Sequence, residues 1–208
     1  MIKTYAYIDA SNLFYGGEKD LGWKIDYRKL IGYLKEKYSV SVTFYFGGVE
    51  IHDFEYDYLK YDTLPLTALL KHLEMQLIAK KPLSRDPANL IRKHIQNVKF
   101  YIKLREFGYI LRLKPIKSYI QENGLLKKKA NCDVEMAYYL MREIKYYKKV
   151  LILSGDGDFL PVLKYLQSIG KEVVIVARAS RTAKELKRFA GSNFRDFIRL
   201  KNVLEFIE

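Results

Sequence analysis

The most informative segment of the sequence is Leu151-Ile152-Leu153-Ser154-Gly155-Asp156-Gly157-Asp158-Phe159. Its apolar run is typical of a buried strand, and it is followed by two carboxylates two residues apart. A helix over residues 159–169, ended by Gly170, is predicted next. Such a turn directs its acidic side chains to one point beyond the sheet. Carboxylate oxygens are preferred ligands of Mg²⁺ and Mn²⁺, so the turn is a candidate metal site. The alternative is an ordinary turn in which Asp158 caps the helix.

Strand and helix patterns alternate on both sides of this stretch. Strands are predicted at residues 5–8, 40–46, 109–113, 150–154 and 173–177, with a short final strand at 197–200. Gly47 and Gly48 are expected to end the second strand. Helices are predicted at 27–38 with Asp26 as N-cap, and at about 87–108, 131–146 and 180–190. The alternation predicts an α/β fold with a mainly parallel sheet.

Residues 49–86 do not follow this alternation. The tract is rich in tyrosine and charge, with a helical run at 66–79, and we expect it to be an insertion within one domain of residues 1–208. His52, Asp53, Glu55 and Asp57 are interpreted as a solvated loop face, because no scaffold pattern fixes them as metal ligands.

Composition excludes several classes of protein. No apolar run reaches the roughly 20 residues of a membrane span, and residues 1–5 lead into strand-like sequence without a signal segment, so a cytoplasmic protein is expected. The only cysteine, Cys132, rules out an intramolecular disulfide and a cysteine zinc cluster. His52, His72 and His94 lack ligand spacing, which argues against a histidine metal site.

The chain is strongly basic. Its 37 basic and 24 acidic residues give a net charge of +13, which favours nucleic acid as a partner and, second to it, an anionic membrane surface. Its 18 tyrosines and 11 phenylalanines include candidate surfaces for stacking unpaired bases.

Four acidic residues from three segments are predicted to meet at one edge of the sheet. Asp9 follows the first strand, Asp156 and Asp158 follow the fourth, and Asp133 lies in the first turn of a helix. Strand carboxyl ends and the following helix N-termini share that edge in a parallel sheet. Asp133 heads the series Ala137, Leu140 and Ile144, which predicts that it shares the inward face of its helix. Clustered carboxylates oppose ionisation unless a cation neutralises them, so the cluster indicates a divalent metal.

Candidate substrate-binding residues surround these acids. Ser11 and Asn12 follow Asp9 and are expected to orient it or to contact a phosphate, with Asn12 as a simple helix N-cap the alternative. Ser154 is expected to orient Asp156 or bind phosphate. Phosphate contacts are further predicted for basic residues at the same edge, namely Lys127, Lys128, Lys129, Arg178 and Arg181.

Three segments together resemble the NYN-domain family of PIN-like nucleases. They are residues 9–13 (DASNL), 127–137 (KKKANCDVEMA) and 154–161 (SGDGDFLP), and residues 105–109 and 113–115 also resemble it. A glycine is usual in the family where Ala130 or Asn131 stands, a departure that leaves Asp133 in place. The resemblance implies a Rossmann-like sheet of order 3-2-1-4-5 with helices on both faces. It also implies Mg²⁺- or Mn²⁺-dependent hydrolysis of phosphodiesters, generally in RNA, with metal held by Asp9, Asp133, Asp156 and Asp158.

The sequence thus predicts a metal-dependent endoribonuclease whose partner is RNA, single-stranded RNA included. No membrane partner is expected, and a homodimer is left open. The alternative is a non-catalytic nucleic-acid-binding module of the same fold. The enzyme is favoured because none of the four acids is replaced by a neutral residue.

Overall fold

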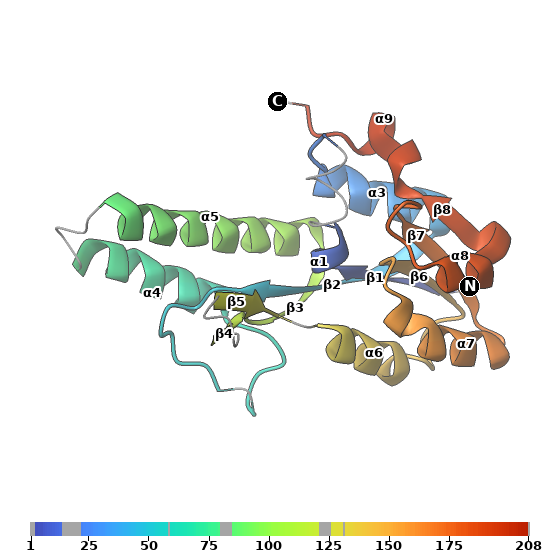
Figure 1. Ribbon diagram of the computed structural model, residues 1–208, viewed down its shortest axis with the longest axis horizontal. Coiled ribbons are helices and arrows are strands. Elements are labelled where there is room, and N and C mark those ends of the chain that lie inside the picture. The colour runs from blue at the N-terminus through green and yellow to red at the C-terminus, as the bar shows by residue number, and fades with distance from the viewer. Residues whose placement is uncertain are drawn as a thin grey trace. The chain divides into compact units, whose positions relative to one another are not determined.

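The computed structural model describes residues 3–13, 22–57, 59–79, 85–120, 126–130 and 132–207 (Figure 1). The chain divides into two compact units. The first unit contains Met1–Phe46, Phe107–Ile110 and Cys132–Glu208, and the second contains Gly47–Glu106 and Leu111–Asn131. The second unit is therefore longer than the insertion predicted at residues 49–86.

The main sheet has six parallel strands in the order β3-β2-β1-β6-β7-β8. Its strands are β1 (Thr4–Asp9), β2 (Val40–Val49), β3 (Ile110–Pro115), β6 (Lys149–Leu153), β7 (Glu172–Ala177) and β8 (Phe194–Asp196). Counted along the chain within this sheet, the order is 3-2-1-4-5-6, so the predicted order 3-2-1-4-5 is confirmed and a sixth strand lies at the edge. The first and fourth strands of this count, β1 and β6, pair directly.

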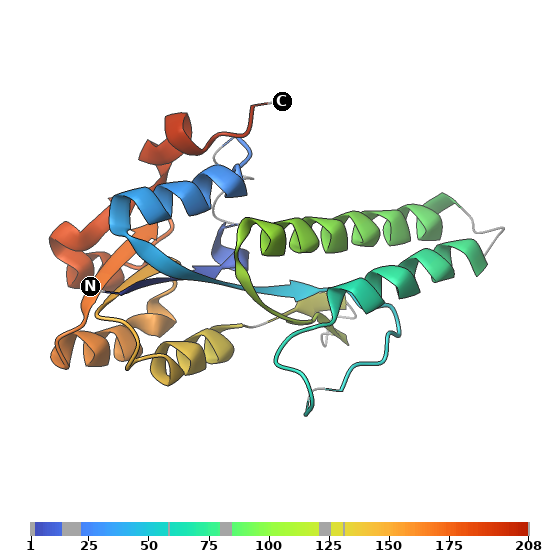
Figure 2. The same cartoon turned by 180° about the vertical axis from the view of Figure 1, so that it is seen from behind.

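Helices cover both faces of the sheet in the first unit, as predicted. They are α1 (Ala10–Leu13), α3 (Tyr27–Tyr38), α6 (Asp133–Arg142), α7 (Leu160–Ser168), α8 (Lys184–Ala190) and α9 (Lys201–Leu204), with short 3₁₀ turns η2 (Gly157–Phe159), η3 (Gly191–Asn193) and η4 (Phe197–Leu200). In both views α3 and α9 lie on one face, and α6 and α7 lie on the opposite face (Figures 1 and 2). Asp26 caps α3 as predicted, its carboxylate accepting hydrogen bonds from the N–H groups of Arg28 and Lys29.

The core of the first unit is rich in aromatic side chains. Tyr7 stacks on Phe44 and Phe46, with ring centroids 5.2 and 6.2 Å apart, and all three are buried. The Tyr7 hydroxyl donates to the Tyr139 carbonyl of α6, and the buried Tyr147 hydroxyl donates to the Leu140 carbonyl. Burial raises the pKa of both phenols, which therefore remain hydrogen-bond donors at neutral pH. These bonds fix α6 against the strands that carry the candidate site.

The second unit contains α4 (Leu66–Ala79), α5 (Arg85–Phe107) and a two-stranded antiparallel sheet of β4 (Lys117–Ile120) and β5 (Leu126–Lys129). The helix predicted at residues 66–79 is confirmed as α4, and α5 begins and ends within two residues of its predicted bounds. Among the helices in the described part of the chain, none has the length and apolar character needed to cross a membrane.

The structure corrects three of the predicted elements. β2 continues through Gly47 and Gly48 to Val49, where glycine is needed because a Cβ at Gly48 would collide with Ala130 and Ile116. The final strand lies at β8, and residues 197–200 form η4, because the Asp196 carboxylate accepts from the Ile198 N–H and starts that turn. The helix predicted at residues 131–146 is observed as the shorter α6, which ends at Arg142.

Candidate active site

Asp9 lies at the carboxyl end of β1, directly beside the end of β6. The parallel register pairs Ile8 with Leu153, so Asp9 and Ser154 follow on adjacent strands. Asp9 is buried, with 4% of its surface exposed, and Ser154 is fully buried. The Ser154 hydroxyl donates to Asp9 Oδ2 at 3.1 Å. The pairing of β1 with β6 follows from the predicted strand order, which is confirmed.

The other oxygen of Asp9 is held by the turn that follows it. Asp9 Oδ1 accepts from the Ser11 N–H at 2.9 Å, the Ser11 hydroxyl at 2.6 Å and the Asn12 N–H at 3.3 Å. Asn12 in turn reaches across to the β6 turn, where its Oδ1 accepts from the Gly155 N–H at 3.0 Å. Ser11 and Asn12 therefore orient Asp9 and join the two strand ends, one of the two roles predicted for them.

Asp156 begins the 3₁₀ turn η2. Its Oδ1 accepts from the Asp158 N–H at 3.0 Å, and its own N–H donates to the Ser154 hydroxyl at 3.2 Å. Asp158 is exposed and contributes its backbone to this turn. Asp156 caps η2, whereas α7 has Phe159 as its N-cap and no side-chain cap, so the alternative in which Asp158 caps the helix is wrong.

Asp133 is the first residue of α6. The fully buried residues of that helix are Met136, Tyr139 and Leu140, and Asp133 is half-buried at the edge of the face they form. The predicted inward series is thus correct for Leu140, whereas Asp133 lies beside the buried face. α6 packs against both β1 and η2, the two elements that carry or follow the other acids.

One further carboxylate lies against the acidic turn. A Cβ built on Gly157 would lie 2.8 Å from Glu185 Oε1, so the Glu185 side chain lies over the Asp156-Gly157-Asp158 turn. Sequence reasoning did not select Glu185. The available signal was its position in the first turn of the helix that follows β7, since those helix N-termini lie at the same edge as the strand ends.

The loop after β7 borders the acidic turn. The Ala183 N–H donates to the Gly155 carbonyl at 3.1 Å, and the Thr182 hydroxyl donates to the Arg178 carbonyl at 2.7 Å. Arg178 and Arg181 lie in this loop, Arg178 half-buried and Arg181 exposed, so the structure places both beside the β6 turn. Lys127, Lys128 and Lys129 instead form β5 in the second unit, and their side chains lie outside the described part of the structure.

The electrostatics of Asp9 fit a cation. Among the described residues, its hydrogen-bond partners are all uncharged, and no basic side chain forms an ion pair with it. A buried carboxylate without a counter-ion is costly, and an ionised carboxylate offers about four acceptor sites. Among the described residues, no three His, Cys, Asp or Glu side chains converge closely enough to hold a metal ion. Mg²⁺ commonly uses only one or two carboxylates, with water and substrate phosphate completing its shell, so this oxygen donor set fits it.

The three histidines meet in the second unit, although they are far apart in sequence. His52 Nε2 contacts His94 Nδ1, and His72 Nε2 lies 2.7 Å from the His52 carbonyl oxygen. The Gln76 amide also donates to that carbonyl at 3.0 Å. The bonds hold His52 in a left-handed backbone conformation, with φ of 46°. The three histidines are at least 20 residues apart in the sequence, so their spacing did not predict this cluster. The folding of α4 and α5 brings them together.

Comparison with known proteins places the chain in a family. The family model described as NYN domain matches residues 3–198. The low amplitude and bright protein LabA of Synechococcus elongatus is 22% identical over 204 residues, covering 97% of this chain and 86% of LabA. A protein of unknown function from Vibrio parahaemolyticus is 19% identical with a TM-score of 0.59, covering 94% of this chain and 92% of its own. The T5 5′-exonuclease with bound zinc is 17% identical with a TM-score of 0.47, and the match covers 95% of this chain and 65% of the exonuclease chain.

Proposed function

The chain belongs to the NYN domain family, and we propose that it is a metal-dependent endoribonuclease that hydrolyses RNA phosphodiester bonds with an activated water. The observation that carries the proposal is the hydrogen bond between Ser154 and the buried Asp9, which fixes a carboxylate at the junction of β1 and β6. A buried, oriented anion without a basic partner in the described ranges is an arrangement that a cation would complete.

Asp9, Asp133, Asp156 and Asp158 are proposed as the catalytic residues and as the acids from which the metal ligands come, with Mg²⁺ or Mn²⁺ as the cofactor. In the described residues no three of them converge closely enough to hold the ion alone, so the substrate phosphate and water are proposed to complete its shell. When bound, such an ion supplies Lewis-acid activation of water and neutralises charge at the phosphate. Asp9 offers Oδ2, since Oδ1 already accepts three hydrogen bonds. Asp156 offers the carboxylate oxygen that does not cap η2. Asp158, being exposed, is placed to reach a water or a substrate that arrives from solvent.

The remaining residues are proposed to position these acids or the strand. Ser11, Asn12 and Ser154 hold the carboxylate of Asp9 and the turn at Gly155, and the Ser11 hydroxyl is exposed to an incoming phosphate. Arg178 and Arg181 in the loop after β7 are proposed to contact the RNA backbone, together with Lys127, Lys128 and Lys129. The net charge of +13 supports a polyanionic substrate.

A second candidate function is a binding module of this fold that does not cleave. The absence of three converging ligand side chains among the described residues favours it, because a site completed only by substrate binds metal weakly on its own. The nuclease is favoured over the binding module because Asp9, Asp133, Asp156 and Asp158 are all present.

The test is a cleavage assay with the purified chain. End-labelled single-stranded RNA, duplex RNA and DNA are incubated with Mg²⁺, Mn²⁺ or EDTA, alongside Asp133→Asn and Asp156→Asn. The proposal expects RNA cleavage with metal, none with EDTA, and none by either variant, while RNA binding persists in both. Cleavage that persists in both variants would place the active site elsewhere, and no cleavage of any substrate would favour the binding module.

A further inference from the structure

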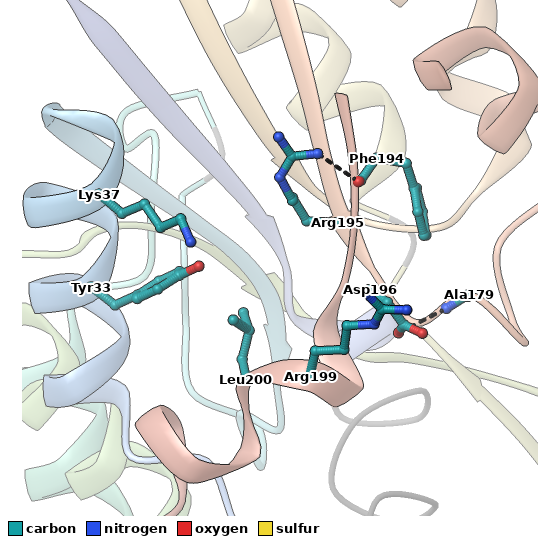
Figure 3. A pocket seen from close by; sticks show the side chains of 8 residues that line it. All are labelled: Tyr33, Lys37, Ala179, Phe194, Arg195, Asp196, Arg199 and Leu200. Atoms are coloured by element: carbon teal, nitrogen blue, oxygen red, sulfur yellow. Dashed lines mark hydrogen bonds between the residues drawn. The ribbon is translucent and has the colours of Figure 1, made fainter. Parts of the chain in front are cut away.

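A cationic pocket lies in the first unit, beside the edge strand β8 (Figure 3). It has a volume of about 640 Å³ and is lined by Tyr33, Lys37, Ala179, Phe194, Arg195, Asp196, Arg199 and Leu200. One wall comes from α3 and the other from β8 and η4, so residues separated by more than 150 positions in the chain form one surface.

The walls of the pocket are built by short, defined contacts. Tyr33 and Lys37 are four residues apart on α3 and share one face, with the Lys37 ammonium 5.5 Å from the centre of the Tyr33 ring. On the opposite wall, Asp196 Oδ1 accepts from the N–H groups of Ala179 and Ile198, both at 3.2 Å. These bonds fix the end of β8 and the start of η4, so the wall is preformed.

The pocket carries more positive than negative charge. Among the described residues that line it, the cations are Lys37, Arg195 and Arg199, and the one acidic residue is Asp196. Arg195 donates to the Ser192 and Phe194 carbonyls, which are uncharged acceptors. Within the described ranges, no carboxylate forms an ion pair with Lys37 or Arg199. Two cations without anionic partners in the described ranges, beside the ring of Tyr33, are groups that bind the phosphate and the base of a nucleotide.

The loop of residues 178–183 contacts both the pocket and the acidic turn. Residues 178–183 join β7 to α8, and the Ala183 end of this loop donates to the Gly155 carbonyl of the acidic turn. The Ala179 end is held by Asp196 in the pocket. An RNA strand that crosses this loop would pass Arg178 and Arg181 between the two places.

We propose that the pocket is a nucleotide-binding subsite that takes one phosphate and its unpaired base from the RNA strand, beside the bond that is cleaved. The inference rests on the proposed function for the identity of the ligand. The shared chemistry, a phosphate attached to a planar base, also occurs in a free mononucleotide, so the experiment separates the two sources.

The test measures equilibrium binding in EDTA, where cleavage is off. A fluorescein-labelled 12-residue single-stranded RNA and free adenosine monophosphate are titrated with the wild-type chain, Lys37→Ala, Arg199→Ala and the control Lys35→Ala. Lys35 is an exposed lysine on the same helix and lies outside the pocket lining. Thermal melts accompany each variant, so that a loss of folding is recognised.

The proposal predicts that Lys37→Ala and Arg199→Ala each weaken RNA binding about threefold to tenfold at low salt, and reduce the slope of log Kd against log salt by about 0.7 per lost phosphate contact. The control Lys35→Ala should change the RNA affinity and the salt slope by less than either variant does. Tyr33→Leu, which removes the ring and keeps apolar bulk, weakens binding about fivefold or more, the range for one stacked base.

Two outcomes contradict the subsite, and a third separates it from the proposed nuclease. If folded Lys37→Ala and Arg199→Ala bind RNA as Lys35→Ala does, the strand does not occupy the pocket. If only adenosine monophosphate binding is lost, the pocket serves free nucleotides, and the strand assignment is wrong. A chain that binds RNA in the predicted manner but never cleaves it would overturn the proposed nuclease while leaving the subsite intact.

Discussion

The Ser154 hydroxyl on the end of β6 lies 3.1 Å from Oδ2 of the buried Asp9 on the end of β1. The same hydroxyl oxygen accepts from the Asp156 N–H at 3.2 Å, so one side chain links two of the proposed ligands. The arrangement depends on β1 and β6 being neighbours, which the parallel register between Ile8 and Leu153 ensures. Each strand end alone would present an ordinary turn.

Replacing Ser154 by alanine should lower both stability and cleavage. Asp9 would lose its partner on Oδ2 while remaining buried, which costs about 1–3 kcal/mol of unfolding free energy, and its carboxylate would no longer be fixed for metal binding. Urea unfolding and cleavage rates measure the two effects. The matched control is Ser168→Ala, since that hydroxyl donates to the Tyr165 carbonyl at an exposed site. Equal losses in the two variants would contradict the role assigned to Ser154.

Substitutions at Asp156 should separate capping from catalysis. Asp156→Asn keeps a good N-cap, so its stability should stay close to wild type, whereas Asp156→Ala should lose about 1 kcal/mol. Both variants should lose metal-dependent cleavage, because neither supplies a carboxylate. Unfolding free energies and single-turnover cleavage rates test this.

Asp158→Ala is the corresponding control for stability, since Asp158 contributes its N–H to the cap and its side chain is exposed. It should unfold within about 0.5 kcal/mol of wild type. A larger loss than that of Asp156→Ala would show that the capping residue is wrongly assigned.

Gly155→Ala should damage the site through crowding. The new Cβ would lie 2.8 Å from Thr182 Oγ1 and 3.0 Å from Thr182 Cα, and the backbone atom cannot move without shifting the loop after β7. We expect a loss of about 1–3 kcal/mol, as for other overpacked sites, with weaker cleavage. Gly32→Ala is the control, because its Cβ would meet no atom within 4 Å and alanine favours the interior of α3. Destabilisation by Gly32→Ala as large as that by Gly155→Ala would contradict the crowding argument.

Tyr147→Phe should destabilise the first unit without changing the chemistry of the site. The hydroxyl donates to the Leu140 carbonyl near the end of α6, at 2.7 Å, and both residues are buried. Loss of the donor leaves a buried carbonyl unpaired, at a cost of about 1–3 kcal/mol.

Burial raises the pKa of the Tyr147 phenol further above its ordinary value, which already lies well above neutral pH. The hydroxyl stays protonated from pH 6 to pH 9, so the difference in unfolding free energy between wild type and Tyr147→Phe should be constant over that range. Denaturant unfolding at several pH values tests this. A difference that disappears by pH 9 would mean that the phenol ionises in the folded chain.

Much of the fold was predictable because its signals are local. The β-branched run of β7 and the periodic apolar face of α3 identify a covered parallel sheet, and Asp26 marks a helix start. The limits of β2 were not predictable, because Gly48 is required by the approach of Ala130 from a distant part of the chain. Likewise, the edge strand β8 and the turn after it depend on pairing with β7, which no pattern within residues 194–200 encodes.

The candidate site was predictable where residues follow strands, and less so where contacts are formed by folding. Asp9 and Ser154 could be paired by topology alone. The contact of Glu185 with the acidic turn and the pocket around Lys37 and Arg199 depend on side-chain placement between elements far apart in sequence. The histidine cluster was missed for the same reason.

The most direct test of the central claim is Mn²⁺-dependent cleavage of end-labelled single-stranded RNA by the wild-type chain, Asp9→Asn and Asp133→Asn, with RNA binding measured in EDTA on the same preparations. We expect wild type to cleave only with metal. Both variants should bind RNA normally but lose cleavage by at least about 100-fold, as expected when a group that stabilises transition-state charge is removed. Cleavage by either variant at the wild-type rate would contradict the account.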